Sequence, residues 1–366
     1  MGLNKSLYDE LSVGMKGPLN LITDVPGVTV GHSTIKTEQI NTGVTAILPQ
    51  TSNLFQSKLP AAAHIINGFG KSVGLIQINE LGSLETPILL TNTFAVGTAM
   101  NALIKYMLNQ NADIGDTTCT VNPLVLECND GTINDIRAMA IQELHVNQAI
   151  ASVEHTFAEG AIGAGTGMCC YGLKGGIGSA SRQVVIDGLP FTIGSLVLSN
   201  FGSLRDLNIY GCPIGAKLHP FFKENEEVEK GSILVILATD LPLDHRQLTR
   251  LCKRSSVGIS RTGAFIGNGS GEIALAFSTA NRIPHASTTM LTTHVSLHES
   301  VMDSLFRATA SVVEESVLSS LIHADATVDR QGRPIHSFCD AMKALQAEQP
   351  DAQVAFLMDK LGLSIT

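Results

Sequence analysis

The pattern of apolar and polar positions divides the chain into short strands and a few amphipathic helices. Short apolar or alternating runs predict strands over residues 21–23, 28–30, 44–48, 72–78, 87–91, 191–198, 232–238 and 273–277. Apolar spacing near 3.6 residues predicts helices over residues 94–109, 134–152, 243–253 and 303–323. Strands in blocks separated by helices indicate an α/β or α+β layered fold. We expect a single domain over residues 1–366, because a strand pattern resumes directly after the polar, loop-like residues 219–230.

Composition narrows the class of protein. The chain is 44% hydrophobic and 16% charged, which excludes intrinsic disorder. No apolar run approaches the ~18 residues that cross a bilayer, so we expect no membrane partner. The net charge of −9 and the absence of a basic stripe argue against nucleic acid. The first twenty residues lack the apolar core of a secretory signal, so we expect a cytoplasmic protein.

Cysteines, histidines and glycine motifs give no sign of a cofactor. Seven cysteines, an odd number with no C-x-x-C pair, are typical of reduced thiols rather than of disulfides or a zinc site. The histidines contain no H-E-x-x-H motif. The glycine-rich residues 159–182 lack the third glycine of a dinucleotide fingerprint, since Met168 stands there. We therefore expect no metal and no organic cofactor, and a glycine-lined wall beside a substrate.

The strongest candidate for chemistry is Ser270, in the segment Ile-Gly-Asn-Gly-Ser-Gly-Glu at residues 266–272. Asn-Gly is also a common hairpin signal, so a plain tight turn is the competing interpretation. In the functional interpretation, the serine attacks the peptide bond before it in an N→O acyl shift. The freed α-amine then serves as a base beside the hydroxyl nucleophile.

Two further strand ends carry polar side chains. Residues 126–135 hold three carboxylates and two carboxamides, and could bind a cation such as a substrate ammonium through Glu127. A polar loop is the alternative there. Asn200 follows the strand-like run 191–198 and could donate a hydrogen bond to an oxyanion, or simply terminate a strand.

Many short blocks in order resemble the DmpA-type self-processing serine aminopeptidases, which include L-aminopeptidase/D-amidase-esterases and β-peptidyl aminopeptidases. The matching blocks are residues 22–32, 41–45, 66–71, 86–93, 129–136, 163–168, 174–178, 200–202, 268–271 and 277–281. The resemblance implies an α-β-β-α sandwich that looks like Ntn hydrolases with different connectivity. It also implies self-cleavage between Gly269 and Ser270 into an α chain, 1–269, and a β chain, 270–366.

The same resemblance assigns roles to site residues. Ser270 matches the nucleophile, Asn200 the oxyanion-hole asparagine, and Glu127 the glutamate that binds the substrate's amino group. Cys128 stands where some members carry a tyrosine, which puts the role of that tyrosine in doubt. The β-peptidyl members use a Ser-x-Glu pair, and alignment places its glutamate at Glu299, with Leu297 at the serine position.

The predicted activity is release of N-terminal amino acids from small peptides, amides or esters through an acyl-enzyme. The family implies a homo-oligomer of processed αβ units, with a tetramer favoured. An N-acetyltransferase of the ornithine acetyltransferase type is the alternative enzyme, although that type usually self-processes at a threonine. A catalytically inactive binding protein with the same fold is the alternative of another class. The motifs leave open whether α-L-, D- or β-amino acids are preferred.

Overall fold

Two β-sheets stacked face to face form the centre of the protein. The computed structural model describes residues 14–222, 231–287 and 289–363, so residues 223–230 of the predicted polar loop lie outside the described part. The smaller sheet has the order β1-β2-β5-β6, with β1 at Thr29–Lys36, β2 at Asn41–Leu48, β5 at Ile88–Asn92 and β6 at Leu124–Cys128.

The larger sheet has the order β13-β3-β12-β11-β10-β9, and β4 (Ser83–Leu84) pairs with β3. Its other strands are β13 (Ile283–Pro284), β3 (Ser57–Gly68), β12 (Gly271–Ser278), β11 (Ser232–Thr239), β10 (Leu189–Asn200) and β9 (Gly176–Ile186). β12 is central: it runs parallel to β11 on one side and antiparallel to β3 on the other. The residue before it, Ser270, therefore lies at the end of a fully paired strand.

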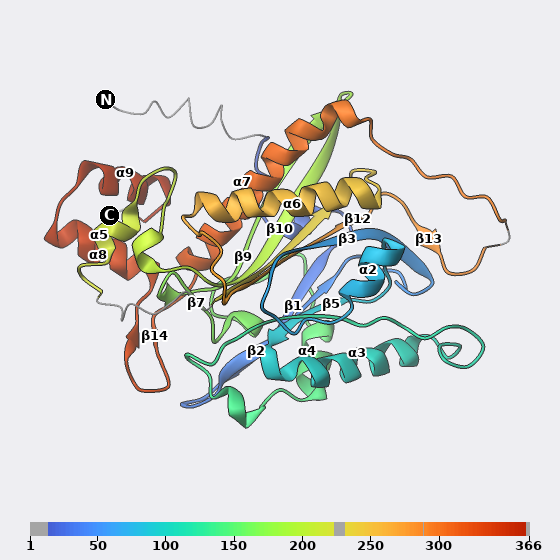
Figure 1. Ribbon diagram of the computed structural model, residues 1–366, viewed down its shortest axis with the longest axis horizontal. Helices are drawn as coiled ribbons and strands as arrows, with labels where there is room; N and C mark the ends of the chain where they lie inside the picture. The colour runs from blue at the N-terminus through green and yellow to red at the C-terminus, as the bar shows by residue number, and fades with distance from the viewer. Residues whose placement is uncertain (1–13, 223–230, 288, 364–366) are drawn as a thin grey trace.

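Helices cover the outer face of each sheet (Figure 1). α6 (His245–Arg261) and α7 (Met302–Ile322) pack on the larger sheet, and α3 (Val96–Gln110) and α4 (Glu143–Ala151) pack on the smaller one. The layer order is thus α-β-β-α, as predicted. The shorter helices are α2 (Leu75–Leu81), α5 (Ile214–Leu218), α8 (Phe338–Glu348) and α9 (Ala352–Lys360).

Each interface between layers has its own apolar core. Leu90 and Leu126 of the smaller sheet meet Leu234 and Leu275 of the larger one between the sheets. Separate clusters fill the spaces under α6 and α7 and under α3 and α4. In the described residues, no helix is both long and apolar enough to cross a lipid bilayer.

Three predictions of local structure are wrong. Residues 21–23 lie largely in a 3-10 helix, Ile22–Asp24. The run 72–78 was expected to be a strand, but Gly74 and Gly82, both with positive φ, bound the helix α2, whose Leu75 and Ile78 face inward at helical spacing. Residues 134–152 form a helix only from Glu143 onward, after a 3-10 turn at Ile136–Ala138.

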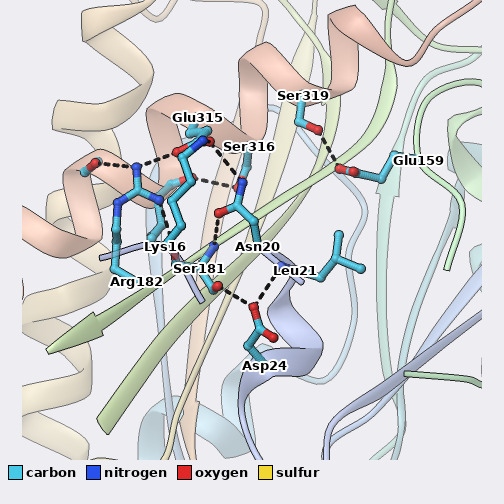
Figure 2. Close-up of polar contacts among 12 residues, drawn as sticks. Lys16, Asn20, Leu21, Asp24, Glu159, Ser181, Arg182, Glu315, Ser316 and Ser319 are labelled. Carbon is cyan, nitrogen blue, oxygen red and sulfur yellow. Dashed lines mark hydrogen bonds and ion pairs between the residues drawn. The ribbon is translucent and has the colours of Figure 1, made fainter. Parts of the chain in front are cut away.

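The first described segment is fastened to β9 and α7 by a polar cluster (Figure 2). Glu315 of α7 accepts hydrogen bonds from Lys16 at 2.5 Å and from Asn20 at 3.0 Å, and it also pairs with Arg182 of β9. Asp24 accepts a 2.6 Å bond from the Ser181 hydroxyl. Residues distant in the sequence are thereby joined at β9, the edge strand of the larger sheet.

Candidate active site

Ser270 lies buried directly before β12, inside a tight turn. Its side chain has no exposed surface, and its Oγ donates a 2.7 Å hydrogen bond to the carbonyl oxygen of Gly267. The Ser270 backbone nitrogen donates to the same oxygen at 3.1 Å. A Cβ on Gly271 would lie 2.7 Å from the Phe69 carbonyl oxygen, so the glycine after Ser270 permits the close approach of β3.

The end of β3 connects Ser270 to Glu127. Gly271 pairs with Gly68, and the next residue, Phe69, donates from its backbone nitrogen to the Ser270 carbonyl oxygen at 3.3 Å. Two residues further, the Lys71 backbone nitrogen donates to Glu127 Oε1 at 2.7 Å. Residues 68–71 are themselves exposed, so this loop lies at the surface between the buried serine and the buried carboxylate.

Glu127 lies near the carboxyl end of β6 and is 5% exposed. Besides Lys71 it accepts a short hydrogen bond from the Thr93 hydroxyl, which follows the neighbouring parallel strand β5. Within the described residues, no lysine, arginine or histidine forms an ion pair with it. A buried carboxylate held only by neutral donors can complete its charge balance with an ammonium group.

Asn200 is the last residue of β10, at the same end of the larger sheet as Ser270. The strand register places Asn200 opposite Ser232, and Ser232 opposite Gly271. Its Oδ1 accepts from the Cys169 backbone nitrogen at 2.9 Å, and its Nδ2 donates to the Asn129 carbonyl oxygen at 2.9 Å. Because both ends of the amide are engaged, its orientation is fixed, and Nδ2 retains a second N–H for another acceptor.

A buried network supports the turn after β6. Asp130, 1% exposed, accepts from the Thr42 hydroxyl at 2.6 Å and from the Asn134 amide at 3.1 Å. Asn92 in turn donates to the Thr42 hydroxyl at 2.9 Å. Burial raises the pKa of the Asp130 carboxyl, and the hydrogen bonds oppose that rise. The network fixes the backbone that carries both Glu127 and the carbonyl group of Asn129.

Lys174 is a supporting residue that the sequence analysis did not identify. Its ammonium group is buried and donates to the carbonyl oxygens of Gly165 at 3.0 Å, Met168 at 2.8 Å and Gly175 at 2.5 Å. Burial lowers its pKa to about 8. Cys169, whose backbone nitrogen holds Asn200, follows Met168 directly, so Lys174 fixes the loop that orients the asparagine.

Cys128 is a core residue rather than a site residue. It is fully buried in the cluster between the sheets, and its Sγ lies 3.8 Å from the Leu198 carbonyl oxygen. Burial, with the negative charges of Glu127 and Glu272, raises the pKa of its thiol well above the usual value. The thiol therefore stays protonated and is no nucleophile.

Glu299 is not brought to this site. It lies in the 3-10 turn Glu299–Val301 and forms ion pairs with Arg246 and Arg250 of α6. Hydrogen bonds from Arg246 and then from Gln247 lower the pKa of its carboxyl to about 2. The adjacent Leu297 bonds to Pro242, just beyond the carboxyl end of β11, whereas Ser270 lies at the opposite end of the parallel strand pair. Strands of eight residues separate the two ends by roughly 25 Å. The structure therefore does not bring Glu299, predicted as a catalytic residue, to Ser270.

Comparison with known proteins shows which family the chain belongs to. The sequence pattern of peptidase family S58 matches residues 20–335. The chain belongs to peptidase family S58. A beta-peptidyl aminopeptidase, BapA, of Sphingosinicella microcystinivorans is 34% identical over 88% of this chain and 86% of its own length.

The fold of this chain is also similar to those of solved structures. The PH0078 protein of Pyrococcus horikoshii superposes with a TM-score of 0.86 at 47% identity, covering 92% of this chain and 97% of its own. The L-aminopeptidase D-Ala-esterase/amidase of Ochrobactrum anthropi, described as a variant of the Ntn hydrolase fold, gives 0.83 at 35% identity, covering 93% and 98%. The predicted family, the DmpA-like sandwich and the serine aminopeptidase class are confirmed.

Proposed function

We propose that this S58 peptidase cuts its own chain between Gly269 and Ser270, and that the new N-terminal Ser270 is its nucleophile. The observation that carries the proposal is the short path along residues 69–71, where the Phe69 N–H bonds to the Ser270 carbonyl oxygen and the Lys71 N–H bonds to Glu127. This path joins a hydroxyl nucleophile to a carboxylate suited to an ammonium group, which is the pairing that an aminopeptidase needs.

Self-cleavage also accounts for the burial of Ser270. With no exposed surface, its hydroxyl cannot meet a substrate while residues 267–269 cover it. Oγ would attack the Gly269 carbonyl carbon, the C–N bond would break, and the hydroxyl proton would pass to the released amine. Water would then hydrolyse the ester, leaving a Gly269 carboxylate and a free Ser270.

The fold supports a stable product of two chains. β12 would begin the β chain of residues 270–366, yet it is paired along its length with β11 and β3 of the α chain, residues 1–269. Separation of the chains would break the centre of the larger sheet. We therefore expect the cleaved chains to remain together as one αβ unit.

In the mature site, Glu127 would bind the substrate's N-terminal ammonium. Ser270 Oγ would attack the first carbonyl carbon, with the Ser270 α-amine taking the proton. The second N–H of Asn200 Nδ2, with a backbone N–H, would stabilise the oxyanion before water hydrolyses the acyl-enzyme. The substrate would be a small peptide, amide or ester with a free amino group.

The beta-peptidyl relative makes β-amino acids one substrate class to test, beside α-L- and D-amino acids. Acetyl transfer of the ornithine acetyltransferase type has no comparable support, since the matching family is one of peptidases. We further propose a homo-oligomer, with a tetramer favoured, in the cytoplasm. The absence of disulfides among the seven cysteines of the described residues supports a reducing compartment.

The decisive experiment compares Ser270→Ala with the unaltered protein. The unaltered protein should give two bands on a denaturing gel, with Ser270 at the new N-terminus, and should hydrolyse amino-acid p-nitroanilides. Ser270→Ala should give one band and no hydrolysis. Two bands from Ser270→Ala would exclude self-cleavage by this serine, and a single active band from the unaltered protein would exclude the need for cleavage.

A further inference from the structure

One side-chain amide spans the bond at which we propose the chain is cut. Asn67 Nδ2 donates to the Gly267 carbonyl oxygen at 2.9 Å and to the Ser270 carbonyl oxygen at 2.5 Å. An amide nitrogen has two hydrogens, so both bonds can form at once. Asn67 therefore fixes the backbone on both sides of the Gly269–Ser270 peptide.

The Gly267 carbonyl oxygen accepts three of the hydrogen bonds in this turn. It accepts from Asn67 Nδ2, from the Ser270 backbone nitrogen at 3.1 Å and from Ser270 Oγ at 2.7 Å. These bonds close the turn and hold the serine hydroxyl inside it. The attacking oxygen is thereby kept next to the peptide bond that precedes it, as an intramolecular attack requires.

The backbone of the same turn is strained at Ile266. Its φ is +62°, and of the non-glycine residues with positive φ in the described ranges it alone is β-branched. A β-branched residue adopts this left-handed conformation rarely and at a cost, because its Cβ crowds the backbone. Such strain persists only where the surroundings impose it.

Both ends of the strained segment are anchored. At Gly263 an added Cβ would lie 1.8 Å from the Asp206 carbonyl oxygen, and the Thr262 carbonyl oxygen accepts a 2.9 Å bond from Asn208. At the other end Asn67 and Phe69 hold Ser270. The residues between must bridge two fixed points, and only a break in the chain frees them.

We propose that Asn67 is a positioning residue for self-cleavage and that the strain at Ile266 accelerates the same step. The proposal rests on the cleavage between Gly269 and Ser270 proposed above. Asn67 holds the two flanking carbonyl groups while Oγ adds to the Gly269 carbonyl carbon and the C–N bond breaks. Release of the amine then lets Ile266 return to an ordinary conformation, so strain in the uncut chain lowers the barrier to cutting.

The test measures the rate at which freshly synthesised precursor splits into two chains. Asn67→Ala removes both hydrogen bonds, and Asn67→Asp has nearly the same size but cannot donate them. Both should slow splitting by roughly 10- to 100-fold, because each of the two lost bonds is worth about a factor of 3 to 10. Mass spectrometry of the slowly formed product should still find Ser270 at the new N-terminus.

The strain is tested by matched substitutions at one position. Ile266→Gly and Ile266→Asn tolerate positive φ and should slow splitting by roughly tenfold, whereas Ile266→Val keeps the β-branch and should split at the unaltered rate. Asp187→Gly is the remote control, because Asp187 also has positive φ, +51°, in the exposed turn between β9 and β10. It should leave the rate unchanged.

The outcomes separate this inference from the proposed function. If Asn67→Ala and Asn67→Asp both split as fast as the unaltered chain, the role of Asn67 is refuted. If Ile266→Gly splits as fast, or Asp187→Gly slows equally, the role of strain is refuted. If Asn67→Ala does not fold, Asn67→Asp decides. Failure of the unaltered chain to split would instead refute the proposed function itself.

Discussion

Glu127 Oε1 accepts a 2.7 Å hydrogen bond from the backbone nitrogen of Lys71. Lys71 lies two residues after Phe69, whose backbone nitrogen donates to the Ser270 carbonyl oxygen. One exposed loop therefore sets the separation between the carboxylate and the serine. Its length would determine which carbonyl of a bound substrate reaches Ser270 Oγ once the amino group rests on Glu127. This relationship makes Glu127 the first residue to test.

Glu127→Gln should weaken recognition of the amino group while leaving self-cleavage intact. Loss of a charge-assisted contact should lower kcat/KM for amino-acid p-nitroanilides by about 100-fold. The precursor carries no ammonium at its cut site, so the two chains should still form. Steady-state kinetics and a denaturing gel of one preparation measure both effects. Unchanged kinetics, or an uncut Glu127→Gln chain, would contradict the assignment.

Asn200→Asp should reduce kcat far more than it changes KM. A carboxylate cannot donate to an oxyanion and repels it, so kcat should fall by about 10² to 10³. Ser199→Ala is the matched control, because the neighbouring Ser199 hydroxyl bonds to Ser320 of α7, on the other face of the sheet. That control should retain kcat. Equal loss in both variants would indicate damage to the strand instead of loss of a donor.

The chain's apolar pattern predicts a layered α/β or α+β fold, and the family resemblance implies the α-β-β-α order, but not every strand is predicted. β9 begins within the glycine-rich residues 159–182, where the pattern predicts no strand because Gly176 and Gly178 interrupt it. The glycines have a packing reason: a Cβ at Gly178 would lie 2.0 Å from the Ser316 carbonyl oxygen of α7. β3 was missed because Pro60 and the alanines 61–63 have low strand propensity, and neighbouring strands hold it in place.

The candidate site also has residues that the sequence predicts and residues that it does not. The sequence predicts Ser270, Asn200 and Glu127 as site residues because each lies beside a strand-like run and matches a site residue of the family it resembles. Lys174 and Asn67 were not assigned roles, since both bind backbone carbonyl oxygens contributed by distant or looping segments. Every residue has a main-chain carbonyl oxygen, so the sequence does not indicate which of them a given side chain will bind.

Lys174→Met should lower both stability and turnover. Three buried carbonyl oxygens would lose their donor, which should cost about 2–3 kcal/mol of unfolding free energy. The loop that carries Cys169 should loosen, so kcat should fall while KM changes little. Lys36→Met, at an exposed lysine near the same loop, is the control and should behave as the unaltered protein. Denaturant unfolding and kinetics of both variants check this, and equal behaviour would contradict the role of Lys174.

The lowered pKa of Lys174 predicts a specific pH dependence of stability. Its pKa is about 8 in the folded chain and 10.5 when exposed. Between these values the unfolded chain binds more protons, so the unfolding free energy should rise with pH from about 8 to 10.5. The measurement is the difference between unaltered protein and Lys174→Met across that range. A flat or falling difference would contradict the buried environment of the ammonium group.

Glu315 should hold the two proposed chains together. In the processed protein it would lie in the β chain, while Lys16, Asn20 and Arg182 lie in the α chain (Figure 2). Glu315→Gln would leave the Arg182 guanidinium, 6% exposed, without its counter-charge, at a cost of about 3 kcal/mol. Glu314→Gln is the matched neighbour: Glu314 pairs at 3.2 Å with Arg261, whose side chain is 47% exposed, and its loss should cost under about 1 kcal/mol.

Size-exclusion chromatography of processed protein in increasing urea gives the test of this inter-chain contact. Glu315→Gln should separate into two chains at a clearly lower urea concentration than the unaltered protein, and Glu314→Gln should not. The difference between the variants isolates the buried pair, because both remove one negative charge from adjacent positions of α7. Identical midpoints for the two variants would mean that β12, paired on both edges, holds the chains together without help from Glu315.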